Sequence, residues 1–388
     1  MDVKTMDQTY VAGTYARFDV QITSGAGDLF FDENGKEYID LGSGIAVNIF
    51  GTGDEEWKRA VKAQLDAFQH TSNLYYTAPC ANLAKMLCER TGLKRVFFGN
   101  SGAEANECAI KVARKYAEDK GRFGENIITL KNSFHGRTLA TLAATGQDVF
   151  HEHFLPLPGG FLYADANDIA GLENLVSQNK CCAIFMEMVQ GEGGVNALDG
   201  DFVRAAEKLC REHDMLLMVD EVQTGNGRTG KLYAYEHFGV RPDVVTTAKG
   251  LGGGLPIGAC MMGEKCAGTL TAGTHGSTFG GNPVSCAGAV SILSRIDDAL
   301  LCEVAKKGAY LKEQLEGADG VSSVTGLGLM LGVKTRAGAH ARKRRSGAQG
   351  ERQGAPAAAP QHHLGTSGKS RGGHAKSVRG PVTAGTTM

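Results

Sequence analysis

One lysine closes an apolar, β-branched stretch and is followed at once by a cluster of glycines. The stretch VVTTAKGLGGGLPIGA (244–259) contains this residue, Lys249. A partly desolvated lysine has a lowered pKa and can form an imine with an aldehyde, and glycines let backbone approach a bulky group closely. A solvated surface charge is the alternative for a lone lysine. The glycines favour the chemical interpretation. They do not form a Rossmann fingerprint, because Leu255 stands at its last position.

A carboxylate closes a second apolar stretch. Asp220 ends MLLMVD. A carboxylate at the end of such an apolar strand loses hydration, and this costs free energy unless a cation or a hydrogen-bond donor compensates for the loss. The protonated ring nitrogen of a pyridine cofactor is a partner of this kind. A helix cap or a structural ion pair is the alternative.

A candidate anion site precedes a helical stretch. The segment FGNSGAEANECAIKVAR places Gly99, Ser101 and Gly102 just before the helix, where free N–H groups and the helix dipole favour a phosphate. The alternative is a simple N-cap at Ser101, with Glu104 completing a capping box.

Two loops add further polar and aromatic groups. In SFHGRT, Phe134 could stack on a ring and Arg137 could form a carboxylate fork; a core phenylalanine and a surface arginine are the alternatives. EMVQGEGG ends another strand with Glu187 and Glu192. A phosphate site, an aromatic plate, an aspartate and a lysine at strand ends together fit pyridoxal phosphate.

Short apolar strands that alternate with amphipathic helices must position these groups. This alternation predicts an α/β fold with a mostly parallel sheet covered on both faces, and its site should lie at the carboxyl edge. The expected strands are RVFFGNS, NIITL, CCAIFMEMV, MLLMVDE and DVVTTAK, and the expected helices are EANECAIKVARKYAEDK and DFVRAAEKLCREHD. Two hairpins are also expected, in DLFFDENGKEYIDLGSG and in GADGVSSVTGLGLMLGVK.

Bulk composition excludes several classes of protein. A 388-residue chain with 42% hydrophobic and 21% charged residues is ordinary for a globular protein. No apolar stretch approaches the roughly 20 residues that cross a bilayer, so no membrane partner is expected. The formal net charge of −1 gives no sign of an acidic partner. Ten cysteines without a C-x-x-C motif, and a start without a secretory signal, predict a reducing, cytoplasmic location.

The motifs, taken in order, resemble one family. SNLYY, SGAEAN, FHGRT, QGEGG, DEVQTGNGRTG and AKGLGGGLPIGA are together typical of the class III pyridoxal-phosphate aminotransferases of fold type I, and most similar to those acting on acetylornithine. The resemblance runs from about residue 9 to about 334. It implies a large domain with a mostly parallel seven-stranded sheet and a small α+β domain. It also implies a homodimer, with no metal and no nucleic-acid partner.

The family's residue roles carry over to matching positions. Lys249 is implied as the catalytic lysine that binds the cofactor aldehyde. The implied cofactor-binding residues are Ser101, Gly102 and Ala103 at the phosphate, Phe134 on the ring, Asp220 at the ring nitrogen, Gln223 at the ring oxygen and Thr278 at the partner subunit's phosphate. The implied substrate-binding residues are Arg137, Glu192 and Ser277, with Glu192 as a gate.

The resemblance also implies the reaction. The amino group of N2-acetyl-L-ornithine would pass to 2-oxoglutarate, giving N-acetylglutamate 5-semialdehyde and glutamate, a step of arginine biosynthesis. Succinylornithine, ornithine, 4-aminobutyrate and lysine-type donors are alternatives. An inactive, aggregation-prone product of a shifted gene is a hypothesis of another class.

The sequence departs from the family at several places. TGDEE follows Gly51 in place of a histidine-rich turn, Met188 replaces a proline, and Ala103 replaces a common threonine. The expected division is an N-terminal small-domain segment (1–60), a cofactor-binding domain (61–295) and the start of the C-terminal small domain (296–334).

The composition changes abruptly at residue 335. Residues 335–388 contain ten Lys or Arg, one acid and no aromatic residue, which predicts disorder. Read one base later with suitable wobble bases, the codons of ERQGAPAAAPQHH spell SARVRLLPPLNI, which is similar to the family's missing RLLPxLNI strand. We therefore expect an out-of-frame tail. A basic nucleic-acid arm around RKRR is the alternative, which the lack of aromatic residues disfavours.

Overall fold

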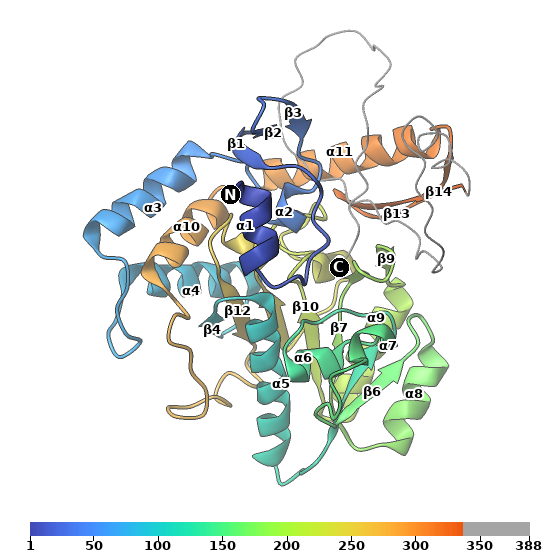
Figure 1. The fold of residues 1–388 in the computed structure, drawn as a ribbon. Helices are drawn as coiled ribbons and strands as arrows, with labels where there is room; N and C mark the ends of the chain where they lie inside the picture. The colour runs from blue at the N-terminus through green and yellow to red at the C-terminus, as the bar shows by residue number, and fades with distance from the viewer. Residues whose placement is uncertain (337–388) are drawn as a thin grey trace.

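A seven-stranded sheet forms the centre of the computed structural model, which describes residues 1–336 (Figure 1). Of the expected tail, 335–388, the structure describes only residues 335 and 336, and Thr335 belongs to the last strand. The expectations for 337–388 lie outside the described residues. The strands lie in the order β4 (Arg95–Gly99), β12 (Gly258–Met262), β11 (Val244–Thr247), β10 (Leu216–Asp220), β7 (Cys181–Met186), β5 (Asn126–Leu130) and β6 (Phe161–Ala164). Neighbours pair in parallel except that β12 runs antiparallel to both β11 and β4. The expected α/β fold and its mostly parallel sheet are confirmed.

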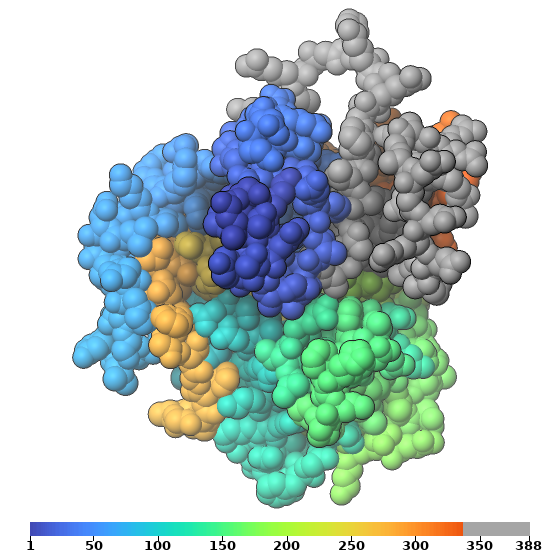
Figure 2. All heavy atoms as spheres, in the orientation of Figure 1, coloured from blue at the N-terminus to red at the C-terminus, as the bar shows by residue number. Residues whose placement is uncertain are grey.

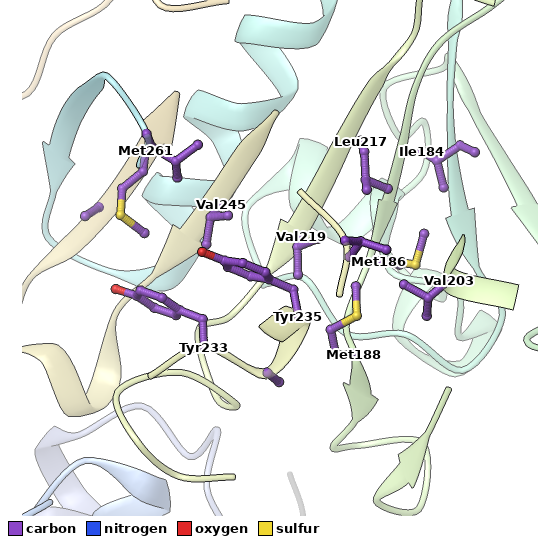
Figure 3. Close-up of a cluster of buried hydrophobic side chains, with 14 of the residues drawn as sticks. Ile184, Met186, Met188, Val203, Leu217, Val219, Tyr233, Tyr235, Val245 and Met261 are labelled. Carbon is purple, nitrogen blue, oxygen red and sulfur yellow. The ribbon is translucent and has the colours of Figure 1, made fainter. Parts of the chain in front are cut away.

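Helices cover both faces of this sheet. Helix α5 (Gly102–Glu118) packs on one face, because residues such as Ala105, Ala109 and Val112 recur at helical spacing and are buried. The opposite face carries helices α4 (Ala78–Thr91), α8 (Ile169–Gln178), α9 (Gly200–Glu212) and α10 (Pro283–Leu293). Figure 3 shows part of this second core, to which Val219 and Met186 of the sheet and Tyr235 all belong. The strands read as continuous apolar segments because both of their faces are buried.

Both expected hairpins are present. Strands β2 (Leu29–Asp32) and β3 (Glu37–Ile39) pair antiparallel and continue a sheet that begins with β1 (Ile22–Ala26). Strands β13 (Val321–Leu327) and β14 (Met330–Thr335) form the second hairpin. Helix α11 (Asp298–Glu316) lies beside β13 and β14 (Figure 1).

The remaining elements are shorter or lie at the periphery. Helix α1 (Val3–Tyr10) has no buried residue, and the N-terminal residues lie on the outside of the face in Figure 2. No helix within residues 1–336 is long and apolar enough to span a membrane. The other elements are α2 (Ser43–Ala46), α3 (Glu55–Ala67), α6 (Leu139–Ala144), α7 (Asp148–His151), β8 (Val189–Gln190), β9 (Asn196–Ala197) and the 3₁₀ turns η1 (Ala234–His237) and η2 (Lys249–Leu251).

Candidate active site

A cavity of about 470 Å³ lies at the carboxyl ends of the central strands, where the sequence predicts the site. Its lining includes most of the residues that the motifs single out. These are Ser101, Gly102, Ala103, Phe134, Arg137, Glu187, Glu192, Asp220, Gln223 and Lys249. Segments that are distant in sequence therefore meet in one place.

Asp220 is the last residue of β10, and its buried carboxylate has three donors. Oδ2 accepts from the Asn106 side-chain amide at 2.7 Å and lies 2.9 Å from Nδ1 of His135. Oδ1 accepts from the backbone N–H of Val222 at 3.0 Å. Because these bonds replace lost hydration, the carboxylate is stable in this buried position and held in one orientation.

Asn106 and His135 are functional neighbours that the sequence reasoning missed. The Thr246 hydroxyl donates to Asn106 Oδ1 at 2.6 Å, which leaves the amide hydrogens for Asp220. His135 is buried and stacks on Phe185 with ring centroids 4.2 Å apart. Its Nε2 has no hydrogen-bond partner among the described residues, and its Nδ1–H is the donor to Asp220. Their only sequence signal was their place in SGAEAN and FHGRT.

Lys249 begins the 3₁₀ turn η2, whereas strand β11 already ends at Thr247. The sequence placed the lysine at the strand end itself, so the strand is shorter than expected. Burial lowers the pKa of Lys249, and the nearby carboxylates of Asp220, Glu192 and Glu187 partly oppose this effect. A lowered pKa increases the fraction of neutral amine, which is the form that attacks an aldehyde.

The start of helix α5 is both capped and available to an anion. Ser101 Oγ accepts from Glu104 N–H at 3.2 Å, and the Glu104 carboxylate accepts from Asn100 N–H at 2.7 Å. The expected N-cap is therefore present. The N–H groups of Gly102 and Ala103 have no acceptor within the helix, since the first turn never provides one. Both interpretations of this motif are compatible with the structure.

The loop after β5 presents an aromatic ring and a guanidinium. The N–H of Phe134 donates to Glu187 Oε2 at 3.0 Å, which fixes the start of this loop to the strand end beside it. The Arg137 guanidinium carbon lies 4.2 Å from the ring centroid of Phe150 and 5.5 Å from that of Phe134. Arg137 thus lines the cavity with its guanidinium beside two aromatic rings.

Both glutamates of EMVQGEGG line the cavity as well. Burial, reinforced by the charge of Asp220, raises the pKa of Glu187 well above its usual range. Burial also raises the pKa of Glu192, although Lys249 and Arg137 oppose this shift. Glu187 thus takes up a proton more readily than an ordinary carboxylate.

Two residues from the HGSTFGGNP loop do not line this cavity. Ser277 Oγ accepts from the Asn100 amide at 3.2 Å and from Gly280 N–H at 3.0 Å, so it supports the loop before α5. Thr278 is exposed. The structure thus brings neither Ser277 nor Thr278 to the lysine within one protomer.

Comparison with known proteins shows the family. The description "Aminotransferase class-III" matches residues 10–354, which extends past the expected limit of 334. The chain belongs to the class III aminotransferases. Acetylornithine aminotransferase from Haemophilus ducreyi is 54% identical over 333 residues, covering 86% of this chain and 85% of the relative. Succinylornithine transaminase from Yersinia pestis is 44% identical over 335 residues, covering 83% and 81%.

Solved structures agree with this family. Ornithine aminotransferase from Toxoplasma gondii matches with a TM-score of 0.82 and 33% identity, covering 86% of this chain and 81% of that one. N-acetylornithine aminotransferase from Stenotrophomonas maltophilia matches with a TM-score of 0.73 and 37% identity, covering 86% and 83%. The expected fold type is confirmed, and the chain is an aminotransferase that depends on pyridoxal phosphate.

The cavity residues fit this cofactor. A helix N-terminus suits its phosphate, a hydrogen-bonded aspartate suits its protonated nitrogen, and a buried lysine suits its aldehyde. Gly102 gives independent support for close packing at the phosphate end. A Cβ at this position would lie 2.6 Å from Cγ1 of Val222, so only glycine fits between the helix start and the loop after Asp220.

Proposed function

We propose that this chain transfers the terminal amino group of N2-acetyl-L-ornithine to 2-oxoglutarate, giving N-acetylglutamate 5-semialdehyde and glutamate. The observation that carries this proposal is one cavity that Lys249, Asp220 and Arg137 line together. The identity to acetylornithine aminotransferases over most of the chain supports the choice of donor.

Lys249 and Asp220 have the central roles in this proposal. Bound pyridoxal phosphate supplies an electrophilic aldehyde and a ring that accepts an electron pair. Asp220 holds the proton on the ring nitrogen, while Asn106 and His135 hold Asp220. Nζ of Lys249 would hold the cofactor at its aldehyde and would also move the proton at the donor's reacting carbon.

The other cavity residues orient the bound molecules. We assign the phosphate to Ser101, Gly102 and Ala103, one ring face to Phe134, and the ring's 3-oxygen to Gln223. Arg137 binds the donor's α-carboxylate through its planar fork. Glu192 gates the site between donor and 2-oxoglutarate. Ser277 lies outside the cavity, so we assign its part in substrate binding to the hydrogen bond by which it holds Asn100, a residue of the cavity lining.

A homodimer completes the proposed site. Thr278 is exposed and lies outside the cavity of its own protomer, so we assign it to the phosphate bound by the partner subunit. Exposed aromatic residues near Thr278 support this assignment, because the Asn73 amide donates to the carbonyls of Ser277 and Gly280 and so joins the 73–76 segment to the loop that carries Thr278. Tyr75, Tyr76 and Phe279 expose most of their surface, and such aromatic side chains are typical of subunit interfaces.

The division into domains is also a proposal. Residues 1–60 and 296–334 would form the small domain, and 61–295 the cofactor-binding domain. The packing of α11 against β13 and β14, apart from the central sheet, supports the C-terminal part of this division. A cytoplasmic location is supported by the ten cysteines, all of which are free thiols in the structure.

A panel of amino donors tests the proposed reaction. The loaded enzyme should use acetylornithine with the highest kcat/KM, ahead of succinylornithine, ornithine and 4-aminobutyrate. Succinylornithine is the second candidate, because transaminases of that name are also similar over most of the chain. A higher kcat/KM for succinylornithine would replace the first proposal by the second.

Sequencing the gene across residues 335–388 tests the proposed out-of-frame tail, and an inactive chain with every donor would support a defective product.

A further inference from the structure

Lys249 has a backbone conformation that does not form without support. Its φ is +44°, in the left-handed region that non-glycine residues rarely adopt. Such a conformation persists only where surrounding contacts hold it. Two side chains outside the cavity hold the backbone on either side of this residue.

We propose that Asn226 and Trp57 are positioning residues that keep the Lys249 amine directed into the cavity. The proposal rests on the assignment of Lys249 as the cofactor-binding lysine. Neither Asn226 nor Trp57 lines the cavity, so each would act through Lys249 and not on the substrate.

Asn226 holds the residues just before Lys249. It is buried, and its Nδ2 donates to Thr247 Oγ1 at 3.0 Å and to the Ala248 carbonyl at 3.3 Å. It also lies close to the residue just after the lysine, since a Cβ built at Gly250 would be 3.4 Å from Asn226 Cβ. Asn226 therefore bonds to the chain neighbour before Lys249 and lies close to the one after it.

Asn226 has a left-handed backbone as well, with φ +58°. Asparagine tolerates this region better than most residues. Glycine tolerates it too, so a glycine at 226 would remove the amide without adding backbone strain.

Trp57 holds the chain beyond Lys249. The N–H of Gly252 donates to the Lys249 carbonyl at 3.1 Å, which closes the turn, and the Gly252 carbonyl accepts from the Trp57 indole N–H at 3.0 Å. Trp57 lies in α3, whose N-cap residue Asp54 forms a two-point ion pair with Arg295, with Nη1–Oδ1 at 3.1 Å and Nη2–Oδ2 at 2.5 Å. The indole therefore projects from an anchored helix.

This helix begins in the TGDEE segment, where the sequence departs from its family. Asp54 of that segment forms the ion pair that anchors the helix, and Trp57 lies about one helical turn after it. Asp54 of this segment therefore anchors the helix whose Trp57 indole contacts the glycine-rich turn after Lys249.

Loss of the Asn226 or the Trp57 hydrogen bonds should let the 247–252 backbone relax, and the amine should then spend less time in its reactive position. The rate of covalent capture of the cofactor should fall, and so should kcat, because Lys249 also moves the proton. The KM for the donor should not change, because its carboxylate binds at Arg137. A purely structural role would lower stability and leave the capture rate unchanged.

The test compares purified apo-protein variants for the rate at which pyridoxal phosphate develops its visible absorbance band. The variants are Asn226→Gly, which removes the amide, and Trp57→Phe, which keeps a ring but removes the N–H donor. Asn167→Gly is the matched control, because Asn167 is left-handed at φ +65° and exposed, and its Oδ1 accepts one backbone hydrogen bond, from Asp199 N–H at 2.9 Å.

We expect capture by Asn226→Gly to slow about tenfold, equivalent to ~1.4 kcal/mol of barrier. Trp57→Phe should slow it at least about threefold, and kcat should fall in parallel while donor KM stays within about twofold. The pH midpoint of the absorbance band should also shift in both variants. A wild-type capture rate in either variant, or an equal loss in Asn167→Gly, would overturn the proposal. A failure of the Lys249 assignment is distinguishable, because Lys249→Ala would then still form the borohydride-stable adduct.

Discussion

Gly102 sets the distance between the start of α5 and the loop after Asp220, and replacing it with alanine tests whether this contact shapes the phosphate site. The new Cβ would lie 2.6 and 2.9 Å from the two methyl carbons of Val222, whereas carbon atoms in contact prefer about 3.5–4.0 Å. The helix start or Val222 must therefore move by about 1 Å.

The magnitude follows from two opposing effects. Overpacking typically costs about 1–3 kcal/mol, while alanine gains at most ~1 kcal/mol over glycine in helix propensity. Because both new contacts are shorter than 3.0 Å, we take the upper part of the overpacking range, about 2–3 kcal/mol, so the net cost is about 1–2 kcal/mol. The backbone shift that relieves the clash moves the N–H groups that we assign to the phosphate, so we expect a comparable loss of binding free energy and a Kd for pyridoxal phosphate that is roughly 5- to 30-fold higher. Gly268→Ala is the control, because nothing lies within 4 Å of a Cβ at that position and its φ is not positive.

Equilibrium titration of the apo-proteins with pyridoxal phosphate measures this effect. The double variant Gly102→Ala/Val222→Ala should recover part of the lost affinity, since the smaller side chain makes room for the new methyl group. A coupling free energy of at least ~0.5 kcal/mol is expected from the four-protein cycle. An unchanged Kd in Gly102→Ala, or strict additivity in the cycle, would refute this reasoning.

Three further predictions concern the site and its support. Asp220→Ala should reduce kcat by well over tenfold, because the ring nitrogen loses its anionic partner, and a smaller loss would mean that Asp220 is structural. Arg137→Lys keeps the charge but loses the fork, so steady-state kinetics should show a raised donor KM with little change in cofactor affinity; an unchanged KM would contradict the assignment. Burial raises the pKa of Glu221 to about 7, so the folded state keeps a proton that the unfolded state loses above about pH 4.5, and stability from this group falls as pH rises towards 7. The Tm advantage of wild type over Glu221→Gln should therefore shrink between pH 5 and pH 8, and a constant or growing advantage would show that the carboxyl is ionised throughout.

Local patterns predicted the elements that carry the chemistry. The apolar stretch before Asp220 and the small residues before the helix at Gly102 are signals within a few positions, and the structure places both residues at the cavity. The cap at Ser101 was also predictable, because the accepting Ser101 hydroxyl and the donating Glu104 N–H belong to residues only three positions apart.

Long-range contacts could not be read from the sequence. Asp220 is held by Asn106 from α5 and by His135 from the loop after β5, and no local pattern connects these three segments. Strand β12 was not expected, and its antiparallel position between β4 and β11 depends on pairing with β4, which is distant in the sequence. The left-handed turn at Lys249 likewise depends on side chains from distant segments.

The central claim is that Lys249 is the residue that binds pyridoxal phosphate. Borohydride reduction of the loaded protein, followed by proteolysis and mass spectrometry, locates the bound cofactor directly. The account predicts one cofactor-derived mass per chain, on the peptide that contains Lys249, and its absence in a folded Lys249→Ala variant. A label on another lysine, or full labelling of Lys249→Ala, would contradict it.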